Sequence, residues 1–132
     1  MAAAESYPDD LKYHREHDWA RIDGDEAVLG ITWFAQDALG ELVHFEAPTA
    51  GSNVAAGRSY GEVESVKAVS DVIAPLSGEI LAVNSAIVDA PETVNSDPYG
   101  DGWLVRVRLA SPDETDSLLD AEAYRQYLAE QG

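Results

Sequence analysis

The stretch GEVESVKAVSDV, residues 61–72, contains Lys67, one of only two lysines in this chain of 132 residues. Two β-prone runs of similar length, residues 60–65 and 69–74, flank Val66-Lys67-Ala68, and this pattern predicts a β-hairpin with the lysine at its tip. An amine on a rigid turn that stands away from the protein body is easy for a modifying enzyme to reach. Lys67 is therefore a candidate for covalent modification, although an isolated lysine beside acids is more often a weakly paired surface charge.

Acidic residues surround this lysine in the sequence and throughout the chain. The formal net charge is −17, which repels nucleic acid phosphates and anionic lipid headgroups, and no basic stripe reverses that effect locally. Glu62, Glu64 and Asp71 would give a basic partner something to bind. We therefore expect protein partners with basic docking faces, and neither nucleic acid nor membrane.

The composition is typical of a globular protein. The chain is 45% hydrophobic, with three Trp and six Tyr, and it has no apolar run long enough for a membrane span. Because it has no cysteine, it can form neither a disulfide nor a Cys-based metal site, and any redox chemistry must come from an attached group. The first ten residues resemble neither a signal nor a transit peptide. We expect a cytoplasmic, monomeric protein with one domain over residues 1–132 and a flexible segment at residues 1–10.

Two elements precede the lysine hairpin. Asp23-Gly24 lies between two β-prone runs within residues 18–32 and suits a tight turn, which predicts another hairpin. Thr32 can cap a short helix over residues 33–40, which Gly40 would close in the left-handed αL conformation. Three apolar side chains of this helix can share one face: Phe34, Ala35 and Leu39.

The remaining β pattern follows the same alternation. Strands are predicted over residues 41–47, 77–84 and 102–110, and residues 85–102 are interpreted as a long polar loop. The last strand has one face for the core and a mostly solvated one. Val105, Val107 and Leu109 form the core face, and they alternate with Leu104, Arg106 and Arg108.

The C-terminal segment is predicted to be helical over residues 112–130. Ser111-Pro112-Asp113-Glu114 offers a capping box with proline at the first helical position. An apolar stripe then follows that can dock on the β body. It comprises Leu119, Ala123 and Tyr127 at four-residue spacing, beside Tyr124 and Leu128.

Patterns for catalysis and metal binding are weak. His14 and His17 lie three residues apart, but their surroundings indicate strand or loop, and only the isolated His44 could add a further imidazole. We interpret these as surface histidines. There is no G-x-S-x-G elbow and no P-loop, and most of the many carboxylates form a solvated face. We expect no catalytic residue, no metal and no enzymatic activity of the chain's own.

Five blocks resemble the H-protein of the glycine cleavage system, in the order and spacing of that family. In particular, ESVKAVSD followed by APLSGEILAVN resembles the family's lipoyl-lysine hairpin. Together the blocks cover almost the whole chain. They are KYHREHDW at 12–19, LGITWFAQDALGEL at 29–42, GEVESVKAVSDVIAPLSGEI at 61–80, VNSDPYGDGW at 94–103 and LLDAEAY at 118–124.

The resemblance implies a mainly β, barrel-sandwich hybrid fold of the lipoyl/biotinyl carrier type, with a short internal helix and a C-terminal helix. It implies that lipoic acid is amide-linked to Lys67. The attachment-site context would be Glu64, Ser65, Val66, Ala68 and Asp71.

The resemblance also implies a non-catalytic carrier with four protein partners. The P-protein, a pyridoxal-phosphate-dependent glycine decarboxylase, transfers an aminomethyl group to the carrier. The T-protein, an aminomethyltransferase, passes the one-carbon unit to tetrahydrofolate, and the L-protein, dihydrolipoyl dehydrogenase, reoxidises the arm. A lipoate-attaching enzyme would load Lys67.

The loaded arm would carry a cationic amine, for which acids near the hairpin tip are the natural receptor. Asp71, four residues after the lysine, matches an acid of the family and is the first candidate; Asp18 is the second. The family usually has His-Glu-Trp where this chain has His17-Asp18-Trp19, so the reach of that acid is shorter by one methylene.

Other roles stay open. A lipoate relay that supplies other lipoyl-dependent complexes would show the same sequence features. An unmodified paralogue could serve as an acidic docking protein. A biotinyl carrier would show Met-Lys-Met, which Val66-Lys67-Ala68 does not match, and a lipoyl domain of a dehydrogenase core would be shorter.

Overall fold

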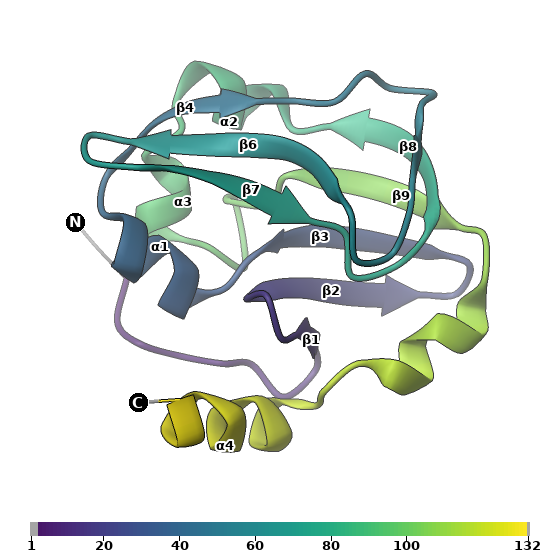
Figure 1. The fold of residues 1–132 in the computed structure, drawn as a ribbon. Coiled ribbons are helices and arrows are strands. Elements are labelled where there is room, and N and C mark those ends of the chain that lie inside the picture. Colours follow the sequence, from purple (N-terminus) through teal and green to yellow (C-terminus); the bar gives the residue numbers. More distant parts are fainter. Residues whose placement is uncertain (1–2, 132) are drawn as a thin grey trace.

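The computed structural model describes residues 3–131, and within that range the strands form a six-stranded and a three-stranded sheet (Figure 1). The larger sheet has the order β1-β2-β3-β9-β8-β5 and the smaller one the order β4-β6-β7, with every pairing antiparallel. The strands are β1 (Lys12–His14), β2 (Asp18–Asp23), β3 (Glu26–Ile31), β4 (Leu42–Glu46), β5 (Asn53–Val54), β6 (Ser59–Ser65), β7 (Val69–Ile73), β8 (Gly78–Val83) and β9 (Val105–Leu109). The predicted hairpins and strands are therefore confirmed.

The main core gathers apolar side chains of both sheets. β9 shows the principle, because Val105, Val107 and Leu109 are buried while Arg106 and Arg108 are exposed, as the alternation predicts. Facing residues of the smaller sheet include Phe45, Val63 and Val72, each at most 2% exposed. Burial of such side chains is worth roughly 1.5–3 kcal/mol each.

Helix α1 (Trp33–Leu39) begins and ends where the sequence predicts. It differs from the prediction in the conformation of the residue that ends it and in the face that it buries. The Thr32 hydroxyl accepts a hydrogen bond from the Ala35 amide at 3.3 Å and thus caps the helix. Gly40 ends it with φ +86° but ψ −163°, so the predicted αL conformation is wrong. The predicted apolar face is also wrong in part, because Phe34 is 36% exposed whereas Gln36 is buried.

The prediction of a polar loop over residues 85–102 is wrong, because this segment contains helices α2 (Ser85–Asp89) and α3 (Thr93–Ser96). Asn84 caps α2 by accepting a hydrogen bond from Ala86, and its amide group donates to the Asp101 and Trp103 carbonyls. The side chains of Ile87 in α2 and Val94 in α3 are buried in the main core. Such short helices carry little periodicity of their own and depend on tertiary contacts.

The C-terminal helical segment is divided into a 3-10 helix (Pro112–Ser117) and helix α4 (Ala121–Gln131), which lies against β1 (Figure 1). The predicted capping box is wrong, because the Ser111 side chain makes no capping hydrogen bond within residues 3–131. The Glu114 carboxylate instead accepts hydrogen bonds from the amide and hydroxyl of Ser77. Of the predicted stripe, Tyr124 is fully buried and stacks on Tyr13 with the ring centroids 4.8 Å apart.

Residues 3–10 lie against the body of the protein. The Ala3 carbonyl accepts a hydrogen bond from the Trp33 indole at 2.8 Å, and the Tyr7 side chain joins the aromatic cluster of Tyr13, Trp19 and Tyr124. The mobility expected for residues 1–10 stays a prediction, and residues 1 and 2 lie outside the described residues. Among the described residues, no helix is long and apolar enough to cross a membrane.

Candidate modification site at the hairpin tip

The β6–β7 hairpin presents Lys67 at its tip. The two strands pair from Ser59 to Glu64 and from Val69 to Ile73, and Figure 1 shows them side by side, joined at the left by a tight turn. Lys67 lies in that turn, is exposed, and takes part in none of the ion pairs found within residues 3–131. The predicted position of the lysine is thus confirmed.

One buried hydroxyl holds the turn together. Ser65 is 4% exposed, and its Oγ accepts hydrogen bonds from the amides of Lys67 at 3.2 Å and Ala68 at 3.1 Å. The Ser65 amide donates to the Ala68 carbonyl at 2.8 Å and closes the turn. Four backbone polar groups of the tip, the amides of residues 65, 67 and 68 and the carbonyl of residue 68, are therefore satisfied locally, which fixes the place from which the lysine side chain starts.

The Lys67 side chain extends over the end of α1. A Cβ atom built on Gly40 would lie 3.6 Å from Lys67 Cε, so the lysine stem crosses this glycine closely. Next to the lysine, Val66 is 75% exposed and Val69 59% exposed. The two exposed valines form a small apolar patch beside the lysine, which a docking enzyme could cover.

Asp71, the first candidate for contact with a bound amine, lies on the outer face of the smaller sheet. The strand register places it opposite Glu62, which in turn lies opposite Glu46, so three carboxylates form a row across β7, β6 and β4. Asp71 Oδ1 accepts a hydrogen bond from Ser59 Oγ at 3.2 Å, which draws it toward the base of the hairpin. Glu64, one pair nearer the tip, is exposed and lies opposite Val69 and His44.

Asp18, the second candidate, is 2% exposed and lies at the base of the hairpin, far along the strands from the tip. Its Oδ1 accepts a hydrogen bond from the Ile73 amide at 3.3 Å. Burial raises the pKa of Asp18 well above the usual range of a carboxyl, against a smaller lowering by that amide. Burial, together with the charge of Asp18, likewise raises the pKa of Tyr60, whose hydroxyl has no partner among the described residues.

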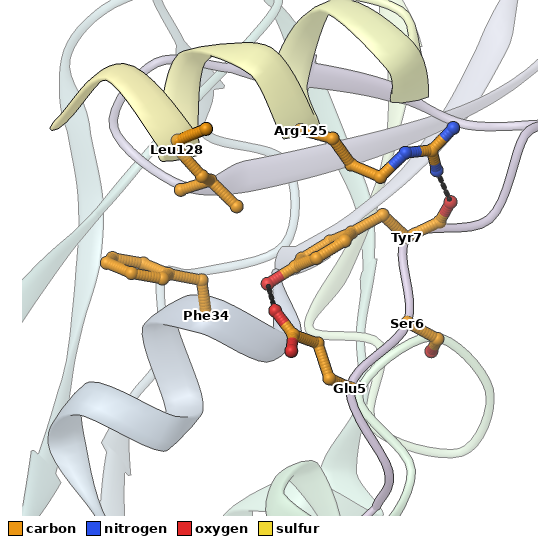
Figure 2. A pocket seen from close by; sticks show the side chains of 7 residues that line it. Glu5, Ser6, Tyr7, Phe34, Arg125 and Leu128 are labelled. Atoms are coloured by element: carbon orange, nitrogen blue, oxygen red, sulfur yellow. Dashed lines mark hydrogen bonds between the residues drawn. The ribbon is translucent and has the colours of Figure 1, made fainter. Parts of the chain in front are cut away.

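Two grooves adjoin opposite ends of α1. The first, of about 700 Å³, lies between α1, α4 and residues 5–7, and Figure 2 shows Phe34 and Leu128 on its apolar side. Its polar side is held by internal hydrogen bonds, from the Tyr7 hydroxyl to Glu5 and from Arg125 to the Tyr7 carbonyl. The second, of about 510 Å³, lies between the C-terminal half of α1 and α3 and includes Gly40.

The histidines do not form a metal site. Residues 3–131 contain no group of three or more His, Asp or Glu side chains arranged to hold a metal ion. His17 is half-buried rather than on the surface, with Nδ1 2.7 Å from the Tyr124 hydroxyl, which lies 2.9 Å from Thr32 Oγ1. Burial lowers the pKa of His17. Its role is structural, since it connects α4 to the cap of α1.

Two sheets packed around one core, with a lysine at the tip of a hairpin, define a carrier-type protein of the barrel-sandwich hybrid fold. The chain belongs to the glycine cleavage H-protein family, whose model matches residues 11–131. It is 48% identical to the glycine cleavage system H protein of Carboxydothermus hydrogenoformans over 95% of this chain and 96% of the relative. It is 52% identical to that of Halorhodospira halophila over 95% of this chain and 97% of the relative.

A solved structure agrees with these matches. The crystal structure of a glycine cleavage system H protein from Mycobacterium marinum superimposes with a TM-score of 0.85 at 44% identity, covering 92% of this chain and 98% of that one. The sequence-based recognition of the family and of the fold class is therefore confirmed.

Sequence reasoning missed two features of the site. The first is the Ser65 hydroxyl as the acceptor that pins the turn, for which a serine two residues before the lysine was a usable signal. The second is the groove beside Gly40, because its two walls come from residues 36–41 and 92–96, and the latter were expected to be a loop.

Proposed function

We propose that this chain is the lipoyl carrier of a glycine cleavage system and that Lys67 is its lipoylation site. In this role the protein takes the aminomethyl group from the P-protein to the T-protein and is reoxidised by the L-protein. It performs no step of catalysis itself. Lipoic acid, amide-linked to Lys67 Nζ, would supply the disulfide that the cysteine-free chain lacks.

The observation that carries this proposal is the exposed lysine at the tip of a pinned hairpin, in a chain of the H-protein family. The site fits an acyl group on the amine, because Lys67 takes part in no ion pair within the described range and its neighbours Val66 and Ala68 are exposed.

The chain's contribution is positional. A tethered group is delivered to successive enzymes at a high effective concentration, without a new diffusional encounter for each free intermediate. Because the Ser65 hydroxyl fixes the turn, little backbone freedom remains to be lost at each docking. The exposed Glu62 and Glu64 on the same hairpin offer charge complementarity to basic docking faces, which favours fast association.

The test is the intact mass of the protein from its native host, with peptide mapping of the segment around Lys67. A lipoyl mass increment on Lys67 is expected. The chain offers a matched control, since Lys12 is its other lysine and is also exposed. Lys12→Arg should retain the increment and Lys67→Arg should lose it.

Lys67→Arg should also leave the free energy of unfolding within a few tenths of a kcal/mol of wild type, as expected for an exposed site. Glycine decarboxylation reconstituted with the P-protein should stop. Retained turnover, or a bare Lys67 in a host whose other lipoyl proteins are modified, would contradict the carrier role and favour an unmodified docking protein.

A further inference from the structure

The larger of the two grooves lies at the N-terminal end of α1, away from the hollow beside Gly40 (Figure 2). Its volume of about 700 Å³ is in the range of binding sites. The family model matches residues 11–131, so the wall formed by residues 5–7 lies outside the matched range. The lining comes from the N-terminal segment, α1 and α4, and comprises Glu5, Ser6, Tyr7, Phe34, Arg125, Leu128 and Ala129.

Phe34 is the apolar centre of this groove. It is 36% exposed, whereas Gln36, two residues further along the same helix, is buried. A helix that exposes its phenylalanine and buries a glutamine reverses the usual distribution, and such reversals are expected where a surface serves binding. The Phe34 ring packs against His17 with the ring centroids 4.5 Å apart, and His17 Nδ1 lies 2.7 Å from the Tyr124 hydroxyl. Phe34 therefore presents a fixed apolar face, opposite Leu128 of α4 (Figure 2).

The charges of the groove favour a cationic occupant. Arg125 is engaged, because it donates to the Tyr7 carbonyl at 3.2 Å and lies 3.7 Å from the Asp9 carboxylate. Glu5 accepts a hydrogen bond from the Tyr7 hydroxyl at 3.0 Å but takes part in no ion pair within residues 3–131. Burial, together with this bond to Glu5, raises the pKa of Tyr7, so its hydroxyl keeps its proton and remains the donor.

A carboxylate beside an apolar wall complements an arginine side chain. The stem of an arginine is apolar and packs on apolar surface, while its guanidinium binds a carboxylate in a forked geometry. Glu5 and the pair of Phe34 and Leu128 provide these two kinds of contact within one groove.

Helix α1 connects the groove with the hairpin tip. Phe34 is six residues from Gly40, which the Lys67 stem crosses, and at 1.5 Å per residue the separation is about 9 Å. Two exposed acids, Asp37 and Glu41, lie along this stretch, which contains no lysine or arginine. An enzyme that covers the tip can therefore also reach the groove, over a surface whose charge attracts a basic segment.

We propose that the groove between Phe34, Leu128 and Glu5 is a second docking site, which binds an arginine-bearing basic segment of an enzyme that also receives Lys67. The arginine stem packs between Phe34 and Leu128, and the guanidinium pairs with Glu5. Two contacts on one rigid body raise the effective concentration of the tip at the active site, so the groove adds affinity without contact with the reacting group. This inference rests on the proposed carrier role of Lys67.

The Michaelis constant of each enzyme for the carrier tests the apolar part of the site. Full-length variants are compared as substrates of the P-, T- and L-proteins after lipoylation, verified by mass, and of the lipoate-attaching enzyme before it. Phe34→Ser should raise KM at least about fivefold in one or more of these reactions and leave kcat unchanged, as expected when an anchoring aromatic side chain is lost. Val88→Ser, at an exposed valine of α2 outside the groove, is the matched control and should leave KM unchanged.

Further variants test the charge and the space of the groove without a change at Phe34. Glu5→Gln should raise KM about 1.4- to fivefold, the range of an exposed ion pair, and the rise should shrink at high salt. Glu122→Gln, an exposed acid of α4 outside the groove, is its control and should leave KM unchanged. Ala129→Trp, which fills the groove without a change of charge, should raise KM as well.

The possible failures can be told apart. A lower KM for Glu5→Gln would indicate an acidic occupant and overturn the proposal. Equal KM values for the wild type and every groove variant in all four reactions would overturn the second docking site and leave the carrier role intact. A wild-type chain that is neither lipoylated on Lys67 nor used by these enzymes would overturn both.

Discussion

Replacement of Ser65 by alanine should loosen the turn that carries Lys67. The substitution removes the acceptor of two backbone hydrogen bonds, from Lys67 at 3.2 Å and Ala68 at 3.1 Å. A hydrogen bond between neutral groups contributes about 0.5–1.5 kcal/mol. Because Lys67 and Ala68 are exposed, water can replace part of each bond, and we expect a total loss of about 1–2 kcal/mol.

The loss should appear as faster amide exchange in the unmodified protein. A loss of 1–2 kcal/mol corresponds to about five- to thirtyfold faster exchange of the residue-65 amide, which closes the turn by donating to the Ala68 carbonyl. The lipoylation rate constant should fall as well, since a mobile tip must be ordered at each docking. Ser70→Ala is the control, because the Ser70 hydroxyl donates to the Asp71 carbonyl and takes part in no other hydrogen bond among the described residues. Unchanged exchange at residue 65, with an unfolding free energy equal to that of wild type, would refute this account of the tip.

Three further substitutions test strand β6 of the hairpin and Asp18 of β2, which accepts a hydrogen bond from β7. Glu62→Gln removes one negative charge from the row of carboxylates, opposite Asp71. The free energy of unfolding, measured in urea, should rise by about 0.2–1 kcal/mol, and by less at high salt because salt screens the repulsion. An unchanged free energy of unfolding at low salt would contradict this prediction. Tyr60→Phe removes a buried hydroxyl that has no hydrogen-bond partner within residues 3–131. It should leave stability unchanged or raise it by about 1 kcal/mol, whereas a clear loss would reveal a partner for that hydroxyl. Burial raises the pKa of Asp18, so the folded state binds this proton more tightly than the unfolded chain does. The stabilising contribution of the protonated carboxyl is therefore complete below the ordinary pKa of 3.8 and is lost as the pH rises through the folded-state pKa. Asp18→Asn should remove this part of the pH dependence of stability, which denaturation measured at pH values from below 3.8 upward would show. An unchanged dependence of stability on pH would show that Asp18 does not contribute to it.

The elements that could be predicted from the sequence are those whose signals are local. The β6–β7 hairpin follows from two β-prone runs around Lys67, and α1 follows from the Thr32 cap and Gly40. In each case the residues that decide the element are adjacent in the chain, so their chemistry can be judged without knowledge of the tertiary fold.

The elements that could not be predicted depend on distant partners. Glu114 stands at the right spacing for a capping box, yet its carboxylate binds Ser77, thirty-seven residues away in the sequence. Helix α3 has four residues and little periodicity, and its Asn95 binds Gln36 and the Gly40 carbonyl. The same long-range contact creates the groove beside Lys67, so the groove was as invisible in the sequence as the helix.

Several features that cost stability lie on the hairpin that presents Lys67 or directly beside it. The row of Glu46, Glu62 and Asp71 sets like charges opposite one another. The Tyr60 hydroxyl of β6 is buried with no partner in the part of the chain that the structure describes, and Asp18 is buried against the Ile73 amide of β7. Residues that lower stability are expected at functional sites. A docking partner can contact the exposed row of charges, but it cannot contact the buried hydroxyl. If the row serves docking, Glu62→Gln should raise stability and lower the rate of lipoylation together, whereas Tyr60→Phe should change stability alone. Equal lipoylation rates for both variants would show that the charge row is not a docking feature.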